Sequence, residues 1–393
     1  MLQVHKDFGL SQFEQGLTSL AGGETVLSLP NSIRAEAVGA TSAAIQLVTT
    51  WARGPSPTLR LHADDLSDAA FQAFAATPFG LAALNGAHRI ESRRGEELSR
   101  YEALMHAKAY IQAMDSGSLR DIRQANAIAL LCLDNARYLG RRQRLYSPSG
   151  QVRSVSDIAD LLTACFGALP IPDARRSGID RMKDDAAAIL YEAFLNTHDH
   201  ALKDISGNDI GRSTRGALIG WRYIDRDVMA RAAEGHEVLK SYFLERAASL
   251  GISKHDQFAE LSVFDSGVGL AQTWLRSKSG LHRPIVEAGV SVDVELEAVD
   301  ACLTKGATTK VNRLAGIGLF RILKLTGALG GFVRIRTGRL SLARAFSRPV
   351  MFKPEDVWMV DAEDGGKPSG DRAWAEGTVL TLVLPLDRSW GPQ

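Results

Sequence analysis

The sequence predicts an α+β fold, with helices on one face of a mixed sheet, preceded by a separate, helix-rich α/β domain. Three observations lead to this prediction. Short β-prone runs alternate with helical periodicity over roughly the first sixty residues. Helical patterns then dominate from about 66 to 165. From about 180 onwards, strands and helices follow in mixed order and end in two closing strands.

The first unit begins as strand, helix, strand. Residues 24–30 and 58–63 are β-prone runs, and residues 35–52 between them place apolar side chains at helical spacing. The stretch 127–136 is too apolar to distinguish a helix from a buried strand.

The best candidate for a domain boundary lies near residue 172. Pro170, Pro172 and the sequence RRSG at 175–178 interrupt the helical pattern. The sequence therefore predicts an N-terminal α/β domain at 1–172, with a regulatory or partner-binding role, and a second domain at 173–393.

The second domain alternates helices and strands around one irregular region. Helical patterns are predicted at about 180–203, 226–249 and 314–331, and strands at 217–224, 259–265, 332–338 and 378–386. Residues 270–315 are rich in Gly, Ser, Thr and Lys and are expected to be irregular.

Composition excludes several classes of protein. The 393 residues are 45% hydrophobic and 23% charged, with a net charge of +1, which is ordinary for a soluble globular chain and gives no clear nucleic-acid signal. Cys132, Cys165 and Cys302 form no zinc spacing and suit a reducing compartment. No signal peptide or long apolar run is present, so we expect a cytoplasmic protein with no membrane partner.

The stretch YEAFLNTHDHAL at 191–202 carries an unusual polar stripe. On a helix, Glu192, Asn196 and Asp199 lie within about 60° of one another. A solvated polar face is the alternative interpretation of such a stripe. His198 and His200 point roughly 200° apart on the same helix, so they are expected to be ordinary histidines rather than a metal pair.

Three glycine-containing motifs follow. In SVFDSGVGL, a strand delivers Asp265, and Gly267 and Gly269 allow a sharp turn and a close approach to a ligand. In AGIGLFRI, Gly316 and Gly318 precede a helix, whose free N–H groups favour phosphate. Gly377 and Thr378 open the last strand, and no P-loop motif occurs anywhere.

The order of these four motifs resembles the Bergerat ATP-binding fold of the GHKL superfamily, which includes gyrase, heat-shock chaperones, histidine kinases and mismatch-repair ATPases. The resemblance covers about residues 178–388. It implies a Bergerat-type α/β sandwich for the second domain, with ATP as substrate or ligand and Mg²⁺ as cofactor.

The resemblance also implies a role for each matching residue. Asn196 would be the Mg²⁺ ligand, and Asp265 would accept a hydrogen bond from the adenine amino group with support from Thr378. The remaining residues that would bind ATP are Asp199, Gly267, Gly269, Gly316 and Gly318, together with Lys305, Thr308 and Lys310 of the ATP lid.

The motif details distinguish the branches of the superfamily. Histidine kinases usually have Asn where this chain has Glu192, whereas hydrolysing members have Glu as the general base. Anti-sigma-factor serine kinases also carry Glu there. The resemblance therefore implies an ATP hydrolase whose nucleotide state regulates the N-terminal domain, a protein partner or a homodimer. The alternatives are a serine kinase of the anti-sigma type and a non-hydrolysing, ATP-gated interaction module.

Overall fold

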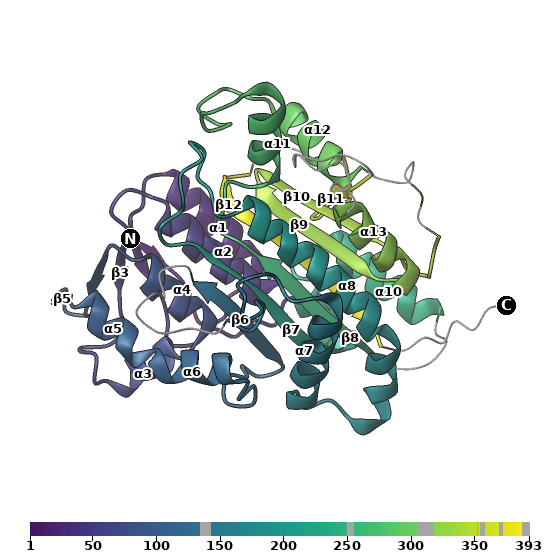
Figure 1. Cartoon of the computed structure of the whole chain (residues 1–393), viewed down its shortest axis with the longest axis horizontal. Coiled ribbons are helices and arrows are strands. Elements are labelled where there is room, and N and C mark those ends of the chain that lie inside the picture. Colours follow the sequence, from purple (N-terminus) through teal and green to yellow (C-terminus); the bar gives the residue numbers. More distant parts are fainter. Residues whose placement is uncertain are drawn as a thin grey trace.

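The computed structural model describes residues 1–133, 143–249, 255–304, 318–351, 353, 358–368 and 372–386. Within these ranges the chain forms a five-stranded and a seven-stranded sheet with helices packed around them (Figure 1). In the same ranges, no helix has the length and apolar character needed to cross a membrane.

The smaller sheet is built from the N-terminal residues. Its first four strands are parallel, which requires crossover connections, and the fifth is antiparallel to the fourth. The strands are β1 (Leu2–Gln3), β2 (Val26–Ser28), β3 (Thr58–Arg60), β4 (Arg89–Glu91) and β5 (Glu97–Leu98). The helices are α1 (Leu10–Ala21), α2 (Ala40–Ala52), α3 (Ala69–Ala75), α4 (Pro78–Gly86), α5 (Arg100–His106) and α6 (Lys108–Ser116).

The predicted strand–helix–strand start is confirmed by β2, α2 and β3. The prediction that helices dominate 66–165 did not include β4 and β5, which together contain only five residues. Such short strands have no detectable alternation, so they are defined by the pairing of β4 with β3 and of β5 with β4 rather than by a local pattern.

The larger sheet has the order β11-β10-β9-β12-β8-β7-β6, and every described pair is antiparallel. The strands are β6 (Ala127–Leu133), β7 (Thr214–Asp225), β8 (His255–Phe264), β9 (Phe332–Gly338), β10 (Leu340–Ala345), β11 (Val360–Asp361) and β12 (Ala375–Pro385). The expectation of a mixed sheet was wrong here. Strand direction depends on long-range pairing, which the local pattern does not reveal.

Helices of the second half follow the prediction, except that the helix predicted at 226–249 is broken into two and that one region was expected to be irregular. They are α7 (Val155–Ala168), α8 (Arg176–His200), α9 (Arg226–Ala232), α10 (Glu237–Ser249), α11 (Leu270–Ser279), α12 (Val292–Leu303) and α13 (Gly318–Leu329), with a 3₁₀ turn at Asp173–Arg175. The region 270–315 was wrongly expected to be irregular, because α11 and α12 lie within it. Gly280 ends α11 in the left-handed conformation, and the Ser291 side chain caps α12.

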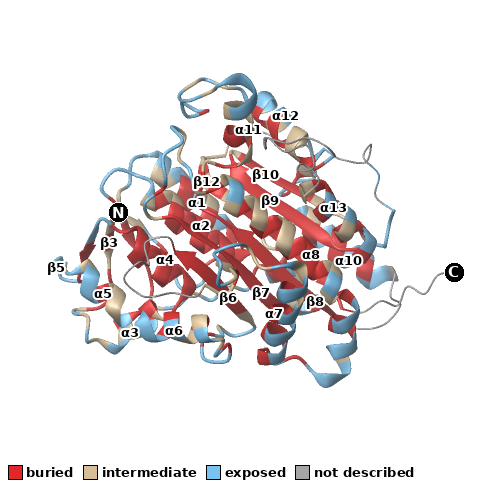
Figure 2. Ribbon diagram, viewed as in Figure 1, coloured by how far each residue is buried: buried red, intermediate tan, exposed pale blue. Residues whose placement is uncertain are grey.

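Helices cover both faces of the larger sheet, not one face as predicted. Side chains alternate along β8, so Glu260 and Ser262 point to one face and Leu261 and Val263 to the other. The α2 helix lies on the first face, where the backbone N–H of Gly39 donates to Glu260 Oε1 at 2.9 Å. The α8 helix also packs on β8, and in Figure 1 it runs across the sheet. The strands are accordingly buried along most of their length (Figure 2).

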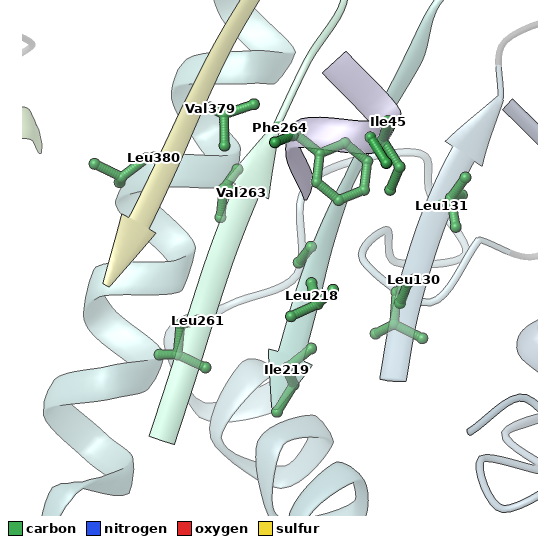
Figure 3. Close-up of a cluster of buried hydrophobic side chains, with 14 of the residues drawn as sticks. Ile45, Leu130, Leu131, Leu218, Ile219, Leu261, Val263, Phe264, Val379 and Leu380 are labelled. Carbon is green, nitrogen blue, oxygen red and sulfur yellow. The ribbon is translucent and has the colours of Figure 1, made fainter. Parts of the chain in front are cut away.

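Residues on both sides of position 172 build the larger sheet. β6 pairs with β7 along its whole length, from Ala127 opposite Gly220 to Leu133 opposite Thr214. α7 packs against α8. The ambiguous stretch 127–136 is thus a strand up to residue 133, and its last three residues lie outside the described ranges. Figure 3 shows side chains of β6, β7, β8 and β12 in a common core that also contains Ile45 of α2.

Candidate functional site

The polar stripe lies on the C-terminal half of α8. Glu192 and Asn196 are half-buried, and their helical neighbours Ala193 and Phe194 are buried in the core. Asp199, in contrast, is exposed near the end of the helix. The apolar side of α8 therefore holds the helix on the sheet, while Glu192 and Asn196 face a neighbouring element.

That neighbour is the start of α13. A Cβ atom built on Gly318 would lie 3.0 Å from Glu192 Oε2 and 3.5 Å from the amide nitrogen Nδ2 of Asn196. The first turn of a helix has free backbone N–H groups and a partial positive charge. The structure thus brings together two motifs that are more than 120 residues apart in sequence and that the sequence assigned to one site.

Asn196 is incompletely satisfied within the described part of the chain. Its amide Nδ2 is buried and makes no hydrogen bond there. Most buried polar side-chain atoms in proteins have a partner, so an unpartnered amide beside a carboxylate and a helix N-terminus is typical of a ligand-binding position.

Arg321 is a residue of this site that the sequence did not single out. It lies one turn into α13, and its Nη1 donates to Glu192 Oε1 at 2.9 Å. In the sequence it is one of many helical arginines, and only the packing of α13 on α8 distinguishes it.

Asp265 follows directly after β8. Its backbone N–H donates to the carbonyl of Thr378 at 3.0 Å, and its Oδ1 accepts from the N–H of Gly267 at 2.8 Å. The side chain is 8% exposed. Burial raises the pKa of Asp265 to about 6, although the N–H groups and the nearby Arg215 and Arg53 act in the opposite direction.

The glycines around Asp265 permit close packing. A Cβ on Gly267 would lie 2.7 Å from Cα of Ala201, the residue that follows α8. Gly377 has φ +69°, and a Cβ there would lie 1.9 Å from the carbonyl oxygen of Asp265. Both positions therefore require glycine. Gly267 also brings the Asp265 turn to the end of α8, five residues or about 7.5 Å along the axis from Asn196.

Thr378 and Gly269 meet at a threonine that the sequence analysis missed. Thr337, near the end of β9, has its Oγ1 3.2 Å from Oγ1 of Thr378 and accepts a hydrogen bond from the N–H of Leu270. A Cβ on Gly269 would lie 2.8 Å from the same hydroxyl. No local motif marks Thr337, because its place depends on the pairing of β9 with β12.

Four of the predicted ATP-binding residues lie outside the described part of the chain: Lys305, Thr308, Lys310 and Gly316. In the described ranges, no three His, Cys, Asp or Glu side chains are grouped closely enough to hold a metal ion. A Mg²⁺ ion needs no such cluster, because it usually binds one or two protein oxygens and completes its shell with phosphate and water. The side-chain oxygen of Asn196 fits that donor set, and its unpartnered Nδ2 could donate to a phosphate oxygen beside the ion.

Comparison of the chain with protein-family models, curated proteins and solved structures gave no match. Function is therefore inferred from the geometry of the chain itself.

Proposed function

We propose that the chain binds Mg-ATP between α8, the start of α13 and the ends of β8 and β12, in a Bergerat-type sandwich, and hydrolyses it. The main support is the contact of Gly318 with Glu192 and Asn196. It joins the first and third motifs of the proposed nucleotide site at a helix N-terminus, where anions are favoured.

The second support is the buried carboxylate of Asp265. Its Oδ1 accepts from the N–H of Gly267, and the backbone N–H of Thr378 also favours the charged form. Each carboxylate oxygen has two lone pairs, so the group keeps acceptor capacity for an exocyclic amine such as that of adenine. Burial of a carboxylate costs stability, and groups with strongly perturbed pKa values are enriched at functional sites. The neighbouring hydroxyls of Thr378 and Thr337 add hydrogen-bonding capacity beside it.

Glu192 is the proposed general base. Arg321 engages its Oε1, and its Oε2 faces Gly318, so one carboxylate oxygen is directed toward the site that we assign to the phosphates. From there it can orient a water molecule and take its proton as the water attacks the γ-phosphorus. When bound, Mg²⁺ would neutralise phosphate charge, with Asn196 as a protein ligand.

Arg53 connects the N-terminal helix α2 to the turn that follows β8. It follows α2 directly, and its Nη2 donates to the carbonyl oxygen of Ser266 at 2.5 Å, within the Asp265–Gly267 turn. We propose that the nucleotide state of the turn is transmitted to α2 by this contact.

The test is incubation of the protein with Mg²⁺ and γ-labelled ATP. Release of labelled phosphate is expected, and the Glu192→Gln variant should bind ATP normally while releasing little phosphate. Label on the protein would instead indicate a kinase, and binding without transfer would indicate an ATP-gated interaction module. Absence of ATP binding in calorimetry would overturn the proposal as a whole.

A further inference from the structure

A cavity lies on the side of α8 that faces away from Glu192 and Asn196. It measures about 720 Å³ and is bounded by the end of α6, the segment 143–153, the end of α8 and the start of β7. Its volume is in the range of small-molecule sites. His198 of α8 lines it, two residues and therefore about 200° around the helix from Asn196.

Three arginines line this cavity: Arg144, Arg153 and Arg215. The described lining contains one carboxylate to oppose them, that of Asp115. Like charges that share a partly enclosed cavity repel one another, so an arrangement of this kind is stabilised when an anion enters.

The arginines are held in place by the protein. Arg215 is 2% exposed, donates to the hydroxyl of Tyr146, and lies over the ring of Tyr146 at 5.6 Å. The same hydroxyl is 3.1 Å from Nδ1 of His198. Nε of Arg153 donates to the carbonyl of Arg144 at 2.7 Å, which fixes one arginine beside another.

Arg144 provides an independent indication of a ligand. Its Nε is buried and has no hydrogen-bond partner among the described residues. Its guanidinium packs against Gly117, which ends α6, where a Cβ would lie 2.9 Å from Nη2. Guanidinium groups bind phosphate through paired N–H groups, and a buried N–H without a partner is costly.

We propose that this cavity binds a phosphate-bearing small molecule, held by Arg144, Arg153 and Arg215, at a site separate from the one assigned to Mg-ATP. A phosphate group is favoured over a carboxylate because it presents three acceptor oxygens to three guanidiniums. The hydroxyls of Tyr146 and Ser147 also lie in the lining and can donate to the same group.

The test is calorimetric titration of the full chain with inorganic phosphate, and separately with succinate, at matched ionic strength. Phosphate is expected to bind with a stoichiometry of one, and succinate about tenfold more weakly. Arg144→Gln and Arg153→Gln should each weaken phosphate binding about tenfold or more. Arg181→Gln, an exposed arginine of α8 outside the cavity, is the matched control and should bind like the wild type.

Asp115→Asn is a second control, which distinguishes loss of the binding site from damage to the fold. Removal of the opposing charge should strengthen phosphate binding by about threefold or more, which a damaged fold cannot do. The proposal is overturned if the wild type does not bind phosphate, if the two arginine variants bind it normally, or if succinate binds better.

A final arm separates this site from the nucleotide site. Phosphate should still bind when Mg²⁺ and a non-hydrolysable ATP analogue are saturating, and loss of binding would assign the phosphate to the nucleotide site instead. If the analogue itself does not bind, the proposed ATPase function fails, while the arginine variants still decide whether the second site exists.

Discussion

The Nη1 atom of Arg321 donates a hydrogen bond to Oε1 of Glu192 at 2.9 Å, and this contact joins α13 to α8. The Arg321 side chain is 44% exposed, so the pair contributes little to stability in water. Its effect is positional, since it holds one carboxylate oxygen and leaves Oε2 directed at Gly318.

Arg321→Ala should therefore lower kcat for ATP about three- to tenfold with little change in ATP affinity, because Glu192 is free to rotate away from the attacking water. Arg321→Lys should restore most of the rate. Steady-state kinetics of both variants, with melting curves as a control, measure this. An unchanged kcat in Arg321→Ala would show that Arg321 does not position Glu192.

Gly318→Ala should weaken Mg-ATP binding about tenfold or more, because its methyl group would occupy the space beside Glu192 Oε2 and Asn196 Nδ2. Stability should not fall, since alanine favours helices more than glycine does. Gly167→Ala in α7 is the control, as a Cβ there meets nothing within 4 Å. Calorimetry compares the two variants, and equal ATP affinities would contradict the assignment of phosphates to this contact.

Asp265→Asn should weaken ATP binding and stabilise the fold at pH 7. The folded pKa of about 6 exceeds the ordinary aspartate value of 3.8, so ionisation of the buried carboxylate costs about 3 kcal/mol at neutral pH. This cost is absent below about pH 3.8, grows between pH 3.8 and 6, and is complete above about pH 6. Urea melts should show the variant gaining its advantage over that window, and a variant less stable at pH 7 than the wild type would contradict the raised pKa.

ATP affinity should depend on pH through the same residue. Only the ionised carboxylate of Asp265 accepts a hydrogen bond on both oxygens, so the Kd for ATP should rise about tenfold for each pH unit below about 6. Titrations between pH 5 and 8 test this prediction. The Asp265→Asn variant should lack this component of the pH dependence, and identical profiles would assign it to another group.

Gly377→Ala should destabilise the protein by about 3 kcal/mol or more, because the new Cβ would collide with the backbone oxygen of Asp265. Gly95 has a similar positive φ of +86° but open space around it. Gly95→Ala should therefore cost only about 1 kcal/mol. Denaturant melts of the pair distinguish the steric clash from the backbone strain, and equal losses would remove the clash as the cause.

Local patterns were sufficient to predict the elements that carry the candidate site. The helix with Glu192 and Asn196, the strand before Asp265 and the strand with Thr378 all lie within one to four residues of their predicted bounds. These segments are long and strongly periodic, so the local pattern of each is sufficient to predict its secondary structure. The region 270–315 was mispredicted because α11 and α12 are short and are defined by Gly280 and the Ser291 cap.

Contacts between distant segments could not be predicted in the same way. The pairing of Thr337 with Thr378 and the reach of Arg53 to Ser266 depend on how β9, β12 and α2 meet. Local patterns determine neither strand direction nor helix placement. The expectation of a mixed sheet covered on one side was wrong for this reason. The assignment of Glu192, Asn196 and Asp265 to nucleotide chemistry stays a prediction.

The pairing of β6 with β7 limits how the chain can be divided. A fragment that begins at residue 173 would open the sheet edge of β7 along Thr214–Gly220, with unpaired N–H and C=O groups along a buried stretch of strand. Such edges recruit strands from other molecules. Expression of the second half alone should therefore yield aggregates or a domain-swapped product, whereas a fragment that retains residues from 127 onwards keeps the strand that closes this edge.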